Sequence, residues 1–546
     1  MADSTNYLGN PNLVKVGVKN EYTKDQIIEY QKCAEDPIYF MVNYIKIVSL
    51  DEGLVPFKMY GFQKKIVETI HNNRFTICKL PRQSGKSTTT ISYLLHYALF
   101  NPNSNIALLA NKSSTARDIL GRLQLAYENL PKWLQQGVIN WNKGNIELEN
   151  KSTIVAAATS SSAIRGGSYN IIFLDEFAFV PTNIAESFFS SVYPTISAGT
   201  KTKMIIVSTP YGMNQFYKLW TDAENKRNDY IPIEVHWSEV PGRDEAWKDQ
   251  TIRNTSEEQF QQEFECEFLG SVNTLINPAK IKNMAYMNPI KSSGSIEVFE
   301  SPIKGNTYVC TVDVARGVDK DYSAFIVFDV TKMPFKVVAI YKNNEVKPFV
   351  FPNIIDQVCK GYNHAHILTE VNDIGQQIAE ALQFEIEYDN ILMTTQKGRA
   401  GQVLGAMYSG RGSSLGVRMT KQIKRIGCAN IKTLMESDKI AVNSFKIIEE
   451  ISTFAKRGQS YQAEDGSNDD LMMCCVMFGW ISNQPYFKEL TNTNARLQMY
   501  EDQQNLIEQD MAPFGFVDNG IDDITNEDSI DEYGDVWSNV DIRKGM

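Results

Sequence analysis

The sequence predicts an α/β protein built from two successive units. From Phe75 to about Gly270, short apolar and β-branched runs alternate with segments of helical periodicity. Four of these runs are expected to form buried strands: 75–80, 106–110, 171–174 and 204–207. The alternation predicts a largely parallel sheet with helices on both faces. A second strand-rich stretch begins at Tyr308 and continues to about Gln484.

Turn residues and shifts in composition set the expected boundaries. Helical spacing of apolar residues begins at Lys24, and the stretch from Leu275 to Ser295 holds two Asn-Pro pairs and a Ser-Ser-Gly-Ser run, which indicate a linker. We therefore expect, in chain order, a polar N-terminal segment (1–24), a first domain (25–272), a linker (273–300), a second domain (301–490), and a helical stretch with an acidic, disordered tail (491–546).

The net charge of −11 is concentrated at the C-terminus. Of the 65 Asp and Glu residues, 13 lie within 501–546, together with two of the 54 Lys and Arg residues, so residues 1–500 carry 52 of each sign. A neutral body with local basic patches leaves a nucleic-acid partner open. No apolar run is long enough to cross a membrane, and the N-terminus lacks a secretion signal. The eight cysteines lack zinc-ligand spacing and are expected to be core thiols in a reducing cytoplasm.

A phosphate-binding loop is indicated between the strand at 75–80 and the helix expected over 88–99. Its residues are Leu80-Pro81-Arg82-Gln83-Ser84-Gly85-Lys86-Ser87. In such a loop, backbone N–H groups surround the phosphates of ATP, Lys86 reaches the β and γ oxygens, and the Ser87 hydroxyl binds the accompanying Mg²⁺. Leu80 replaces the usual first glycine, and Gly-Lys-Ser alone also fits an ordinary helix N-terminus.

Two acids end the apolar strand at 171–174, where an open α/β sheet places its ligand site. Asp175 would hold Mg²⁺ through water, and Glu176 would orient the water that attacks the γ-phosphate. Because they follow a phosphate-binding loop, these acids predict an ATPase. The residues expected to bind ATP are Gln63, Arg82, Gln83, Ser84, Gly85, Lys86, Ser87 and Asp175.

Five residues add weaker signals at the same site. Gln63 would recognise adenine, although its segment is also an ordinary amphipathic helix, and Arg82 would stabilise transition-state charge. Ser208 and Thr209 follow the last buried strand and would couple hydrolysis to movement, or only cap the strand. Arg165 would contact phosphate or DNA, or lie in a surface turn.

The second unit carries acids in an order typical of ribonuclease-H-like nucleases. Asp313 lies in the strand at 308–313, and the chain returns over 322–330 as an antiparallel hairpin. Glu370 closes a later apolar run, and Asp469 opens an apolar helix. Cleavage of phosphodiesters by two Mg²⁺ ions about 4 Å apart needs such carboxylates from distant segments.

We expect Asp313, Glu370 and Asp469 to be the metal ligands, with Asp321 and Asp470 in support. Taken singly, Glu370 also fits a surface acid, and Asp469 and Asp470 also fit N-caps. Which acid of the 469/470 pair binds metal directly stays open. A basic stretch of the same domain would lie along a DNA backbone or form a solvated helix face: Arg418, Lys421, Lys424 and Arg425.

Together these motifs closely resemble the large terminase subunit of tailed bacteriophages, the myovirus type in particular. The resemblance extends from about Lys24 to Gln484. It rests on Arg82-Gln83-Ser84-Gly85-Lys86-Ser87, Trp141-Asn142-Lys143-Gly144, Arg165-Gly166, Asp175-Glu176, Ser208-Thr209-Pro210, Asp313 with Asp321-Tyr322, Glu370 and Asp469-Asp470.

The resemblance implies an N-terminal P-loop ATPase with a largely parallel sheet and a C-terminal ribonuclease-H-like nuclease. It implies a motor that pumps double-stranded DNA into a procapsid, and an endonuclease that cuts concatemeric DNA when packaging starts and ends. The implied partners are DNA, the portal protein, a small terminase subunit and a ring of further copies, a pentamer in that family. The implied location is the host cytoplasm and, transiently, the portal vertex, but neither a membrane nor the mature virion.

By the same resemblance, Arg82 senses phosphate, Glu176 is the catalytic carboxylate of the ATPase, and Ser208 with Thr209 couples hydrolysis to movement. One departure is Asn468, which stands where the family often has His. Three other interpretations stay open: a helicase or restriction-type motor, a non-catalytic packaging or scaffold protein switched by ATP, and a resolvase or integrase with an accessory ATPase.

Overall fold

The computed structural model separates the chain into two compact units, residues 1–491 and 492–546. It describes residues 5–49, 51–160, 164, 166–197, 199–270, 273–315, 322–397, 401–405, 413–458, 460–464, 467–491, 529–530 and 536–537. In the second unit these residues form one short antiparallel pair, β23 (Ser529–Ile530) with β24 (Val536–Trp537). The predicted helical stretch after residue 491 and the rest of the acidic tail lie outside the described residues.

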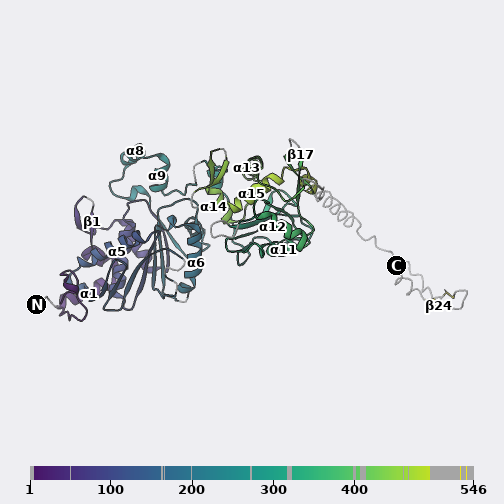
Figure 1. Cartoon of the computed structure of the whole chain (residues 1–546). Helices are drawn as coiled ribbons and strands as arrows, with labels where there is room; N and C mark the ends of the chain where they lie inside the picture. Colours follow the sequence, from purple (N-terminus) through teal and green to yellow (C-terminus); the bar gives the residue numbers. More distant parts are fainter. Residues whose placement is uncertain are drawn as a thin grey trace, which may run out of the picture. The chain divides into compact units, whose positions relative to one another are not determined.

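Eight strands form the first sheet, in the spatial order β10-β3-β9-β8-β4-β7-β6-β5 (Figure 1). Six of them run parallel: β3 (Phe75–Lys79), β4 (Asn105–Ala110), β7 (Thr153–Ala158), β8 (Ile171–Asp175), β9 (Lys203–Ser208) and β10 (Ile231–Glu234). The other two, β5 (Val138–Trp141) and β6 (Asn145–Leu148), extend one edge as an antiparallel hairpin. The four predicted strands and the largely parallel sheet are confirmed.

Helices cover both faces of this sheet, because alternate side chains of a strand enter different cores. Leu108 of β4 packs in one core with residues of α3, α4 and α5, whereas Leu109 packs in the other with residues of α6 and α7. The helices of this part of the chain are α1 (Lys24–Glu35), α2 (Pro37–Tyr44), α3 (Gly61–Asn72), α4 (Lys86–Phe100), α5 (Ser113–Glu128), α6 (Thr182–Ser197), α7 (Gln215–Glu224), α8 (Glu245–Asn254) and α9 (Glu257–Glu263).

The helical spacing that begins at Lys24 belongs to two helices rather than one. Asp36 has an extended backbone between α1 and α2, and its carboxylate accepts the N–H groups of Ile38 and Tyr39 as the N-cap of α2. Pro37 follows at the first helical position, where its missing N–H has no intrahelical partner to lose. A small hairpin, β1 (Lys46–Ser49) with β2 (Gly53–Pro56), comes next.

The segment 273–300, which we expected to be a linker, contributes regular structure to the second core. It contains α10 (Pro278–Lys282), β11 (Lys291–Ser293) and β12 (Ile296–Val298). Leu275, Ile276 and Ile281 are buried with residues of the second sheet. Burial of these apolar side chains, which lie between the Asn-Pro turns, is favourable, so the segment packs against the second core and does not remain extended.

The second sheet has the order β11-β12-β15-β14-β13-β16, and β20 pairs with β15. Besides β11 and β12, its strands are β13 (Tyr308–Asp313), β14 (Ser323–Asp329), β15 (Phe335–Asn343), β16 (His366–Thr369) and β20 (Ile440–Ala441). The predicted hairpin is confirmed, because β13 and β14 pair antiparallel, while β16 joins β13 in parallel. Two smaller sheets combine β17 (Met393–Lys397), β18 (Gly401–Gly405) and β19 (Ser413–Leu415), and β21 (Phe454–Arg457) with β22 (Ser460–Ala463).

The helices of this second part are α11 (Phe351–Gly361), α12 (Gly375–Glu380), α13 (Lys421–Glu436), α14 (Phe445–Thr453) and α15 (Asp470–Ile481). Every residue of α15 from Leu471 onward is buried. A Cβ on Gly427 would lie 2.3 Å from the Val476 carbonyl oxygen, so glycine allows α13 to pack directly against α15. In the parts of the chain that the structure describes, no helix has the length and apolar character needed to cross a membrane.

Candidate active sites

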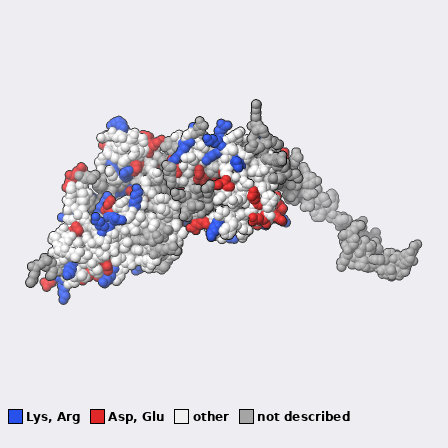
Figure 2. All heavy atoms as spheres, in the orientation of Figure 1, with Lys and Arg blue, Asp and Glu red and all other residues white. Residues whose placement is uncertain are grey.

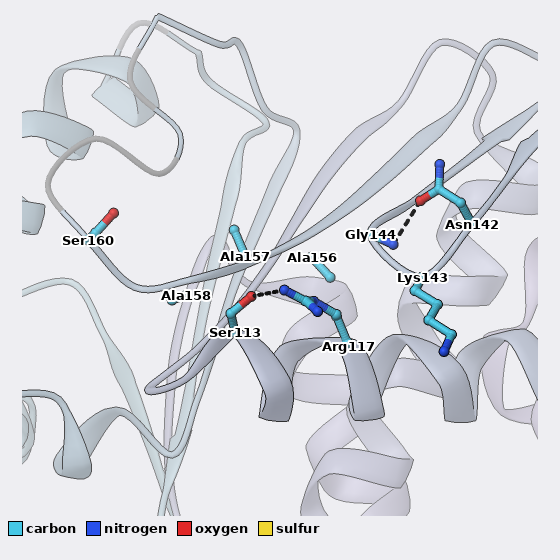
Figure 3. Close-up of a pocket in the computed structure, with 9 residues that line it drawn as sticks. All are labelled: Ser113, Arg117, Asn142, Lys143, Gly144, Ala156, Ala157, Ala158 and Ser160. Carbon is cyan, nitrogen blue, oxygen red and sulfur yellow. Dashed lines mark hydrogen bonds between the residues drawn. The ribbon is translucent and has the colours of Figure 1, made fainter.

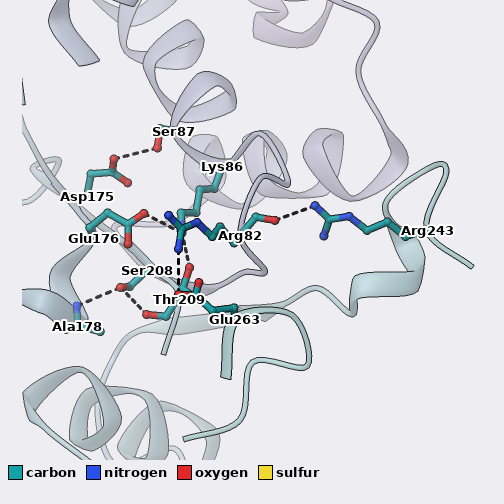
Figure 4. A network of polar contacts seen from close by, with 10 residues as sticks. All are labelled: Arg82, Lys86, Ser87, Asp175, Glu176, Ala178, Ser208, Thr209, Arg243 and Glu263. Atoms are coloured by element: carbon teal, nitrogen blue, oxygen red, sulfur yellow. Dashed lines mark hydrogen bonds and ion pairs between the residues drawn. The ribbon is translucent and has the colours of Figure 1, made fainter. Parts of the chain in front are cut away.

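The first candidate site lies at the carboxyl ends of the neighbouring strands β3, β9 and β8 (Figure 4). The loop after β3 leads to Gly85, the N-cap of α4, whose φ of +78° is in the region that favours glycine. A Cβ here would also lie 2.6 Å from the Gln63 Nε2 atom, so a larger residue would displace that side-chain amide. The order strand, loop, helix is the context that a phosphate-binding loop requires.

Lys86 and Ser87 each contact one of the acids that end β8. Lys86 Nζ is buried and lies 3.0 Å from a carboxylate oxygen of Glu176, and it donates a hydrogen bond to the Thr209 hydroxyl. Ser87 Oγ donates to Asp175 Oδ2 over 2.8 Å. The structure therefore brings together the lysine, the hydroxyl group, both acids and the threonine that the sequence placed at one site.

Asp175 suits a cation-binding role. Burial, followed by the neighbouring charge of Glu176, raises the pKa of its carboxyl to about 6. Its Oδ1 atom is buried and has no hydrogen-bond partner among the described residues, so one acceptor is left over beside Ser87. A Mg²⁺ ion held between Asp175 and Ser87 would use this acceptor and would stabilise the ionised carboxylate.

Ser208 connects the end of β9 with the segment after the two acids. Its hydroxyl donates to the Thr209 carbonyl and accepts the N–H of Ala178, two residues beyond Glu176. Glu176 itself has a φ of +51°, an unusual backbone conformation for a residue with a side chain. Through Ser208, a displacement of Thr209 would therefore be transmitted to the backbone beside Glu176.

The phosphate-binding loop is also held by residues that the sequence analysis missed. Arg82 is largely exposed, and its guanidinium lies 3.1 Å from Glu263. Arg243 donates to the carbonyl oxygens of Arg82, at 2.8 Å, and Gln83, at 3.3 Å. For Arg243, the sequence offered one signal, the aromatic-rich stretch that carries Trp247. In the structure, the Arg243 guanidinium lies over the Trp247 ring at 4.8 Å.

Gln63 lies against the loop and is buried. Its Oε1 atom accepts the N–H of Tyr60 over 2.9 Å, and its Nε2 atom donates to the Ser84 carbonyl over 3.2 Å. In this structure the amide that we predicted to recognise adenine connects α3 to the loop. Arg165 lies outside the described residues.

The second candidate site lies where β13 and β16 end side by side. Val312 and Thr369 are register partners in these parallel strands, and the Glu370 N–H donates to the Val312 carbonyl over 2.9 Å. Asp313 and Glu370 thus leave the same edge of the sheet. The hydroxyl of Thr311 on β13 donates to the Cys474 carbonyl over 3.0 Å, which holds α15 against the strand.

At this edge of the sheet, the charges of acids from two other segments act on Asp313. Burial raises the pKa of the Asp313 carboxyl well above its ordinary value, and Glu370, Asp470 and Asp469 raise it further. Burial also raises the pKa of Glu370, and it raises that of Asp470 to about 7. Buried carboxyls whose pKa is raised by burial and by neighbouring acids form a site that favours bound cations.

The predicted acids are therefore neighbours, although Asp321 lies outside the described residues. Asp470 accepts the Tyr322 N–H through Oδ1 and leaves its buried Oδ2 without a partner among those residues, whereas Asp469 accepts the Ala463 N–H. Within the described ranges, no three His, Cys, Asp or Glu side chains are grouped closely enough to bind a metal ion by themselves. The donor set fits Mg²⁺, which commonly keeps water and substrate oxygens as ligands.

A buried ion pair that the sequence analysis missed supports this edge. Lys342 Nζ lies 2.6 Å from Glu450 Oε1, and Glu450 Oε2 accepts the Met472 N–H in the first turn of α15. The ammonium also lies 4.6 Å from the centre of the Tyr322 ring. Neither residue belongs to a recognisable motif, and Lys342 follows the continuous apolar run of β15 as an ordinary strand-end lysine.

Of the four bases predicted to contact DNA, Lys424 is the one that acts on the acid site, where its charge lowers the pKa of Glu370. Lys421 and Arg425 are exposed on α13, and Arg418 is exposed just before it. Figure 2 shows Lys and Arg side chains gathered over α13. A backbone phosphate that approached Glu370 from this side would meet positive charge.

Comparisons with known proteins give one consistent result. The family described as "Terminase large subunit, T4likevirus-type, N-terminal" matches residues 77–283, and that described as "Terminase RNaseH-like domain" matches residues 310–478. Among solved structures, the chain is similar to the large terminase of bacteriophage HK97, at 13% identity and a TM-score of 0.48 over 82% of this chain and 99% of that one.

Two further solved structures are similar. The large terminase nuclease of thermophilic phage G20c with bound magnesium gives 18% identity and a TM-score of 0.30, over 38% of this chain and 97% of that one. The large terminase of another thermophilic bacteriophage, in complex with ADP, gives 12% and 0.34, over 77% and 98%.

The two family matches together span most of the residues from β3 to α15 and contain both candidate sites. Each match also agrees with the sheet described above, a mostly parallel sheet in the first part and a ribonuclease-H-like sheet in the second. The resemblance predicted from the motifs is confirmed: the chain belongs to the terminase large subunit family, and it is a DNA-packaging ATPase that carries a ribonuclease-H-like nuclease domain.

Proposed function

We propose that this chain hydrolyses ATP at the carboxyl edge of its first sheet, with Glu176 orienting the attacking water. The observation that carries the proposal is the convergence of Lys86 on Glu176 and Thr209, and of Ser87 on Asp175. In the nucleotide-bound state Lys86 would exchange these contacts for phosphate oxygens, and Ser87 and Asp175 would hold Mg²⁺. The ion would neutralise phosphate charge, and Arg82 would add positive charge in the transition state.

We further propose that Asp313, Glu370 and Asp469 bind two Mg²⁺ ions, with Asp470 and Asp321 in support, for cleavage of double-stranded DNA. Burial raises the pKa of both Asp313 and Asp470, and the charge of Asp470 raises that of Asp313 further, which supports this assignment. The ions would stabilise the charge that develops on the attacking and leaving oxygens. The bases on and before α13 would lie along the DNA backbone.

In the packaging cycle, the motor would translocate DNA into a procapsid through the portal, and the nuclease would cut concatemeric DNA at the start and end. The chain would work as a ring, a pentamer by family resemblance, with the portal protein and a small terminase subunit as partners. It would do so in the host cytoplasm at the portal vertex and would be absent from the mature virion. Membership of the terminase large subunit family supports these assignments.

The test follows plasmid cleavage in Mg²⁺ and ATP turnover in the same tubes, for the parent chain and Asp313→Asn. We expect the parent to do both and the variant to hydrolyse ATP without cutting, because the two sites use different residues. If neither protein cuts while both hydrolyse ATP, the second part binds DNA without cleaving it. If Asp313→Asn stops ATP turnover as well, the division into two independent sites is wrong.

A further inference from the structure

A shallow pocket lies on the first domain, apart from both candidate sites (Figure 3). Its volume is about 660 Å³, and it lies between the start of α5, the β5–β6 turn and the end of β7. The lining residues are Ser113, Arg117, Asn142, Lys143, Gly144, Ala156, Ala157, Ala158 and Ser160.

The charge of the pocket has one sign. Arg117 and Lys143 are its only charged lining residues, both are exposed, and neither forms an ion pair with an acid among the residues that the structure describes. Arg117 donates one hydrogen bond, to the Ser113 hydroxyl over 3.0 Å, and its remaining N–H groups stay available. Two unpaired cations beside hydroxyl and amide groups form a surface complementary to a phosphate.

The turn that carries Lys143 is held in place before any ligand arrives. Asn142 Oδ1 accepts the N–H groups of Gly144 and Asn145, each over 2.8 Å, so the turn is closed by its own side chain. Gln124 of α5 donates to the Asn142 carbonyl over 2.9 Å, and the Ala156 N–H donates to the Gly144 carbonyl. The turn is thus attached both to α5 and to β7.

The pocket shares the carboxyl edge of the first sheet with the ATP site. In the register of the sheet, Ala110 of β4 pairs with Asp175 of β8 on one side and with Ala158 of β7 on the other. Neighbouring strands lie about 4.8 Å apart, which places Ala158 roughly 10 Å from Asp175. A ligand in the pocket would therefore lie two strands away from the nucleotide.

We propose that this pocket binds a backbone phosphate of the double-stranded DNA that the motor moves. The proposal rests on the proposed packaging function. The floor of three alanines lets a sugar-phosphate chain approach closely, and the lining offers no aromatic ring for a base and no carboxylate for a ribose hydroxyl. Such a site binds a backbone phosphate and does not contact the bases, so its affinity does not depend on the DNA sequence, as a translocating motor requires.

The experiment measures binding of a random-sequence duplex to the full chain at several salt concentrations, in an Asp313→Asn background that does not cut. We expect the double variant Arg117→Ala/Lys143→Ala to bind DNA more weakly. Each phosphate that is no longer neutralised lowers the slope of log affinity against log salt by about 0.9, so loss of the one phosphate in the pocket lowers it by about 0.9. Arg117→Lys with Lys143→Arg should restore most of the slope.

Arg122→Ala is the matched control, because Arg122 is exposed on the same helix but does not line the pocket. We expect it to leave the slope unchanged. The KM for ATP without DNA is measured on the same samples, and its retention shows that the double variant is folded. An unchanged slope in the double variant overturns the proposal, and so does an equal loss in Arg122→Ala.

A rise in the KM for ATP with unchanged DNA binding would assign the pocket to a nucleotide phosphate and would also overturn the proposal. Failure of the packaging function looks different, because the parent chain itself would then fail to bind duplex DNA or to hydrolyse ATP. If the parent binds duplex DNA and hydrolyses ATP, and the double variant binds DNA with equal affinity, only the role proposed for the pocket is rejected.

Discussion

The buried ion pair between Lys342 and Glu450 gives a sharp prediction for the stability of the nuclease domain. The two side chains are 15% and 5% exposed, and their charged atoms lie 2.6 Å apart. Burial alone would lower the Lys342 pKa, but the Glu450 charge raises it above the ordinary lysine value. Burial raises the Glu450 pKa, and the Lys342 ammonium opposes that shift, so the ammonium is the group that favours the ionised carboxylate. In Lys342→Met, the Glu450 carboxylate would keep the Met472 N–H as its remaining partner.

We expect Lys342→Met to lower the free energy of unfolding of this domain by about 3 kcal/mol, because an unpaired buried charge costs about 3–5 kcal/mol. Lys342→Met combined with Glu450→Gln should recover much of the loss, since no buried charge is then left alone. The matched control is Lys336→Met on the same strand, where Lys336 pairs with Glu300 at 3.1 Å but is 46% exposed. An exposed pair contributes at most about 1 kcal/mol.

The assay is urea unfolding of the full chain with proteolysis of the second domain as the readout, together with hydrogen exchange of the α15 amides. The Met472 amide and its neighbours should exchange faster in Lys342→Met and recover in the double variant. The reasoning is refuted if Lys342→Met costs no more than Lys336→Met, or if the double variant is no more stable than the single one.

Three further predictions concern the ATP site. Glu176→Gln should bind ATP but lose turnover by several orders of magnitude, and rapid steady-state hydrolysis by that variant would reject its assigned role. The kcat/KM for ATP should fall as the pH drops through about 6, because in the nucleotide-free protein the raised pKa of Asp175 leaves its carboxyl neutral below that value. The same shift means that Asp175 lowers folding stability as the pH rises from its ordinary pKa through about 6, which urea unfolding without nucleotide across that range will show. Arg243→Ala should raise the KM for ATP more than it lowers kcat, since two loop carbonyls lose their donor, and an unchanged KM would contradict this.

The sequence predicted those parts of the fold that depend on short local patterns of residues. The strands β3, β4, β8 and β9 are short, apolar and buried on both faces, which is why continuous apolar runs located them. The break between α1 and α2 was missed, although Asp36-Pro37 combines an N-cap with a first-turn proline and was a local signal for it. By contrast, the segment 273–300 has the turn residues of a linker, and only the second sheet shows what its apolar residues pack against.

The candidate sites follow the same division. Asp175 and Asp313 could be found because each ends an apolar strand, and Glu370 because it closes a later apolar run in the order expected for such acids. The structure adds that the strand before Glu370 runs parallel to the one that carries Asp313. Glu263 and Glu450 could not be found, because each acts through a partner far away in the sequence, Arg82 and Lys342. In the sequence each is one acid on a helix with no motif around it, and the pairing exists only in the folded chain.

The phosphate-binding loop shows how a predicted residue can serve two roles. A loop that turns its N–H groups toward phosphate turns carbonyl oxygens away, and these need donors. Gln63 supplies one to the Ser84 carbonyl, so Gln63→Glu would place an acceptor against an acceptor while it keeps the bond from the Tyr60 N–H. We expect weaker binding of nucleotides, measured as the Kd for ATP and for GTP.

The ratio of these two Kd values separates the two roles of Gln63. If Gln63 only supports the loop, both nucleotides lose affinity equally, because the loop contacts phosphate and not the base. If Gln63 also recognises adenine through its second N–H, the preference for ATP over GTP falls as well. A variant that binds both nucleotides as the parent does would show that the loop keeps its shape without the Ser84 contact.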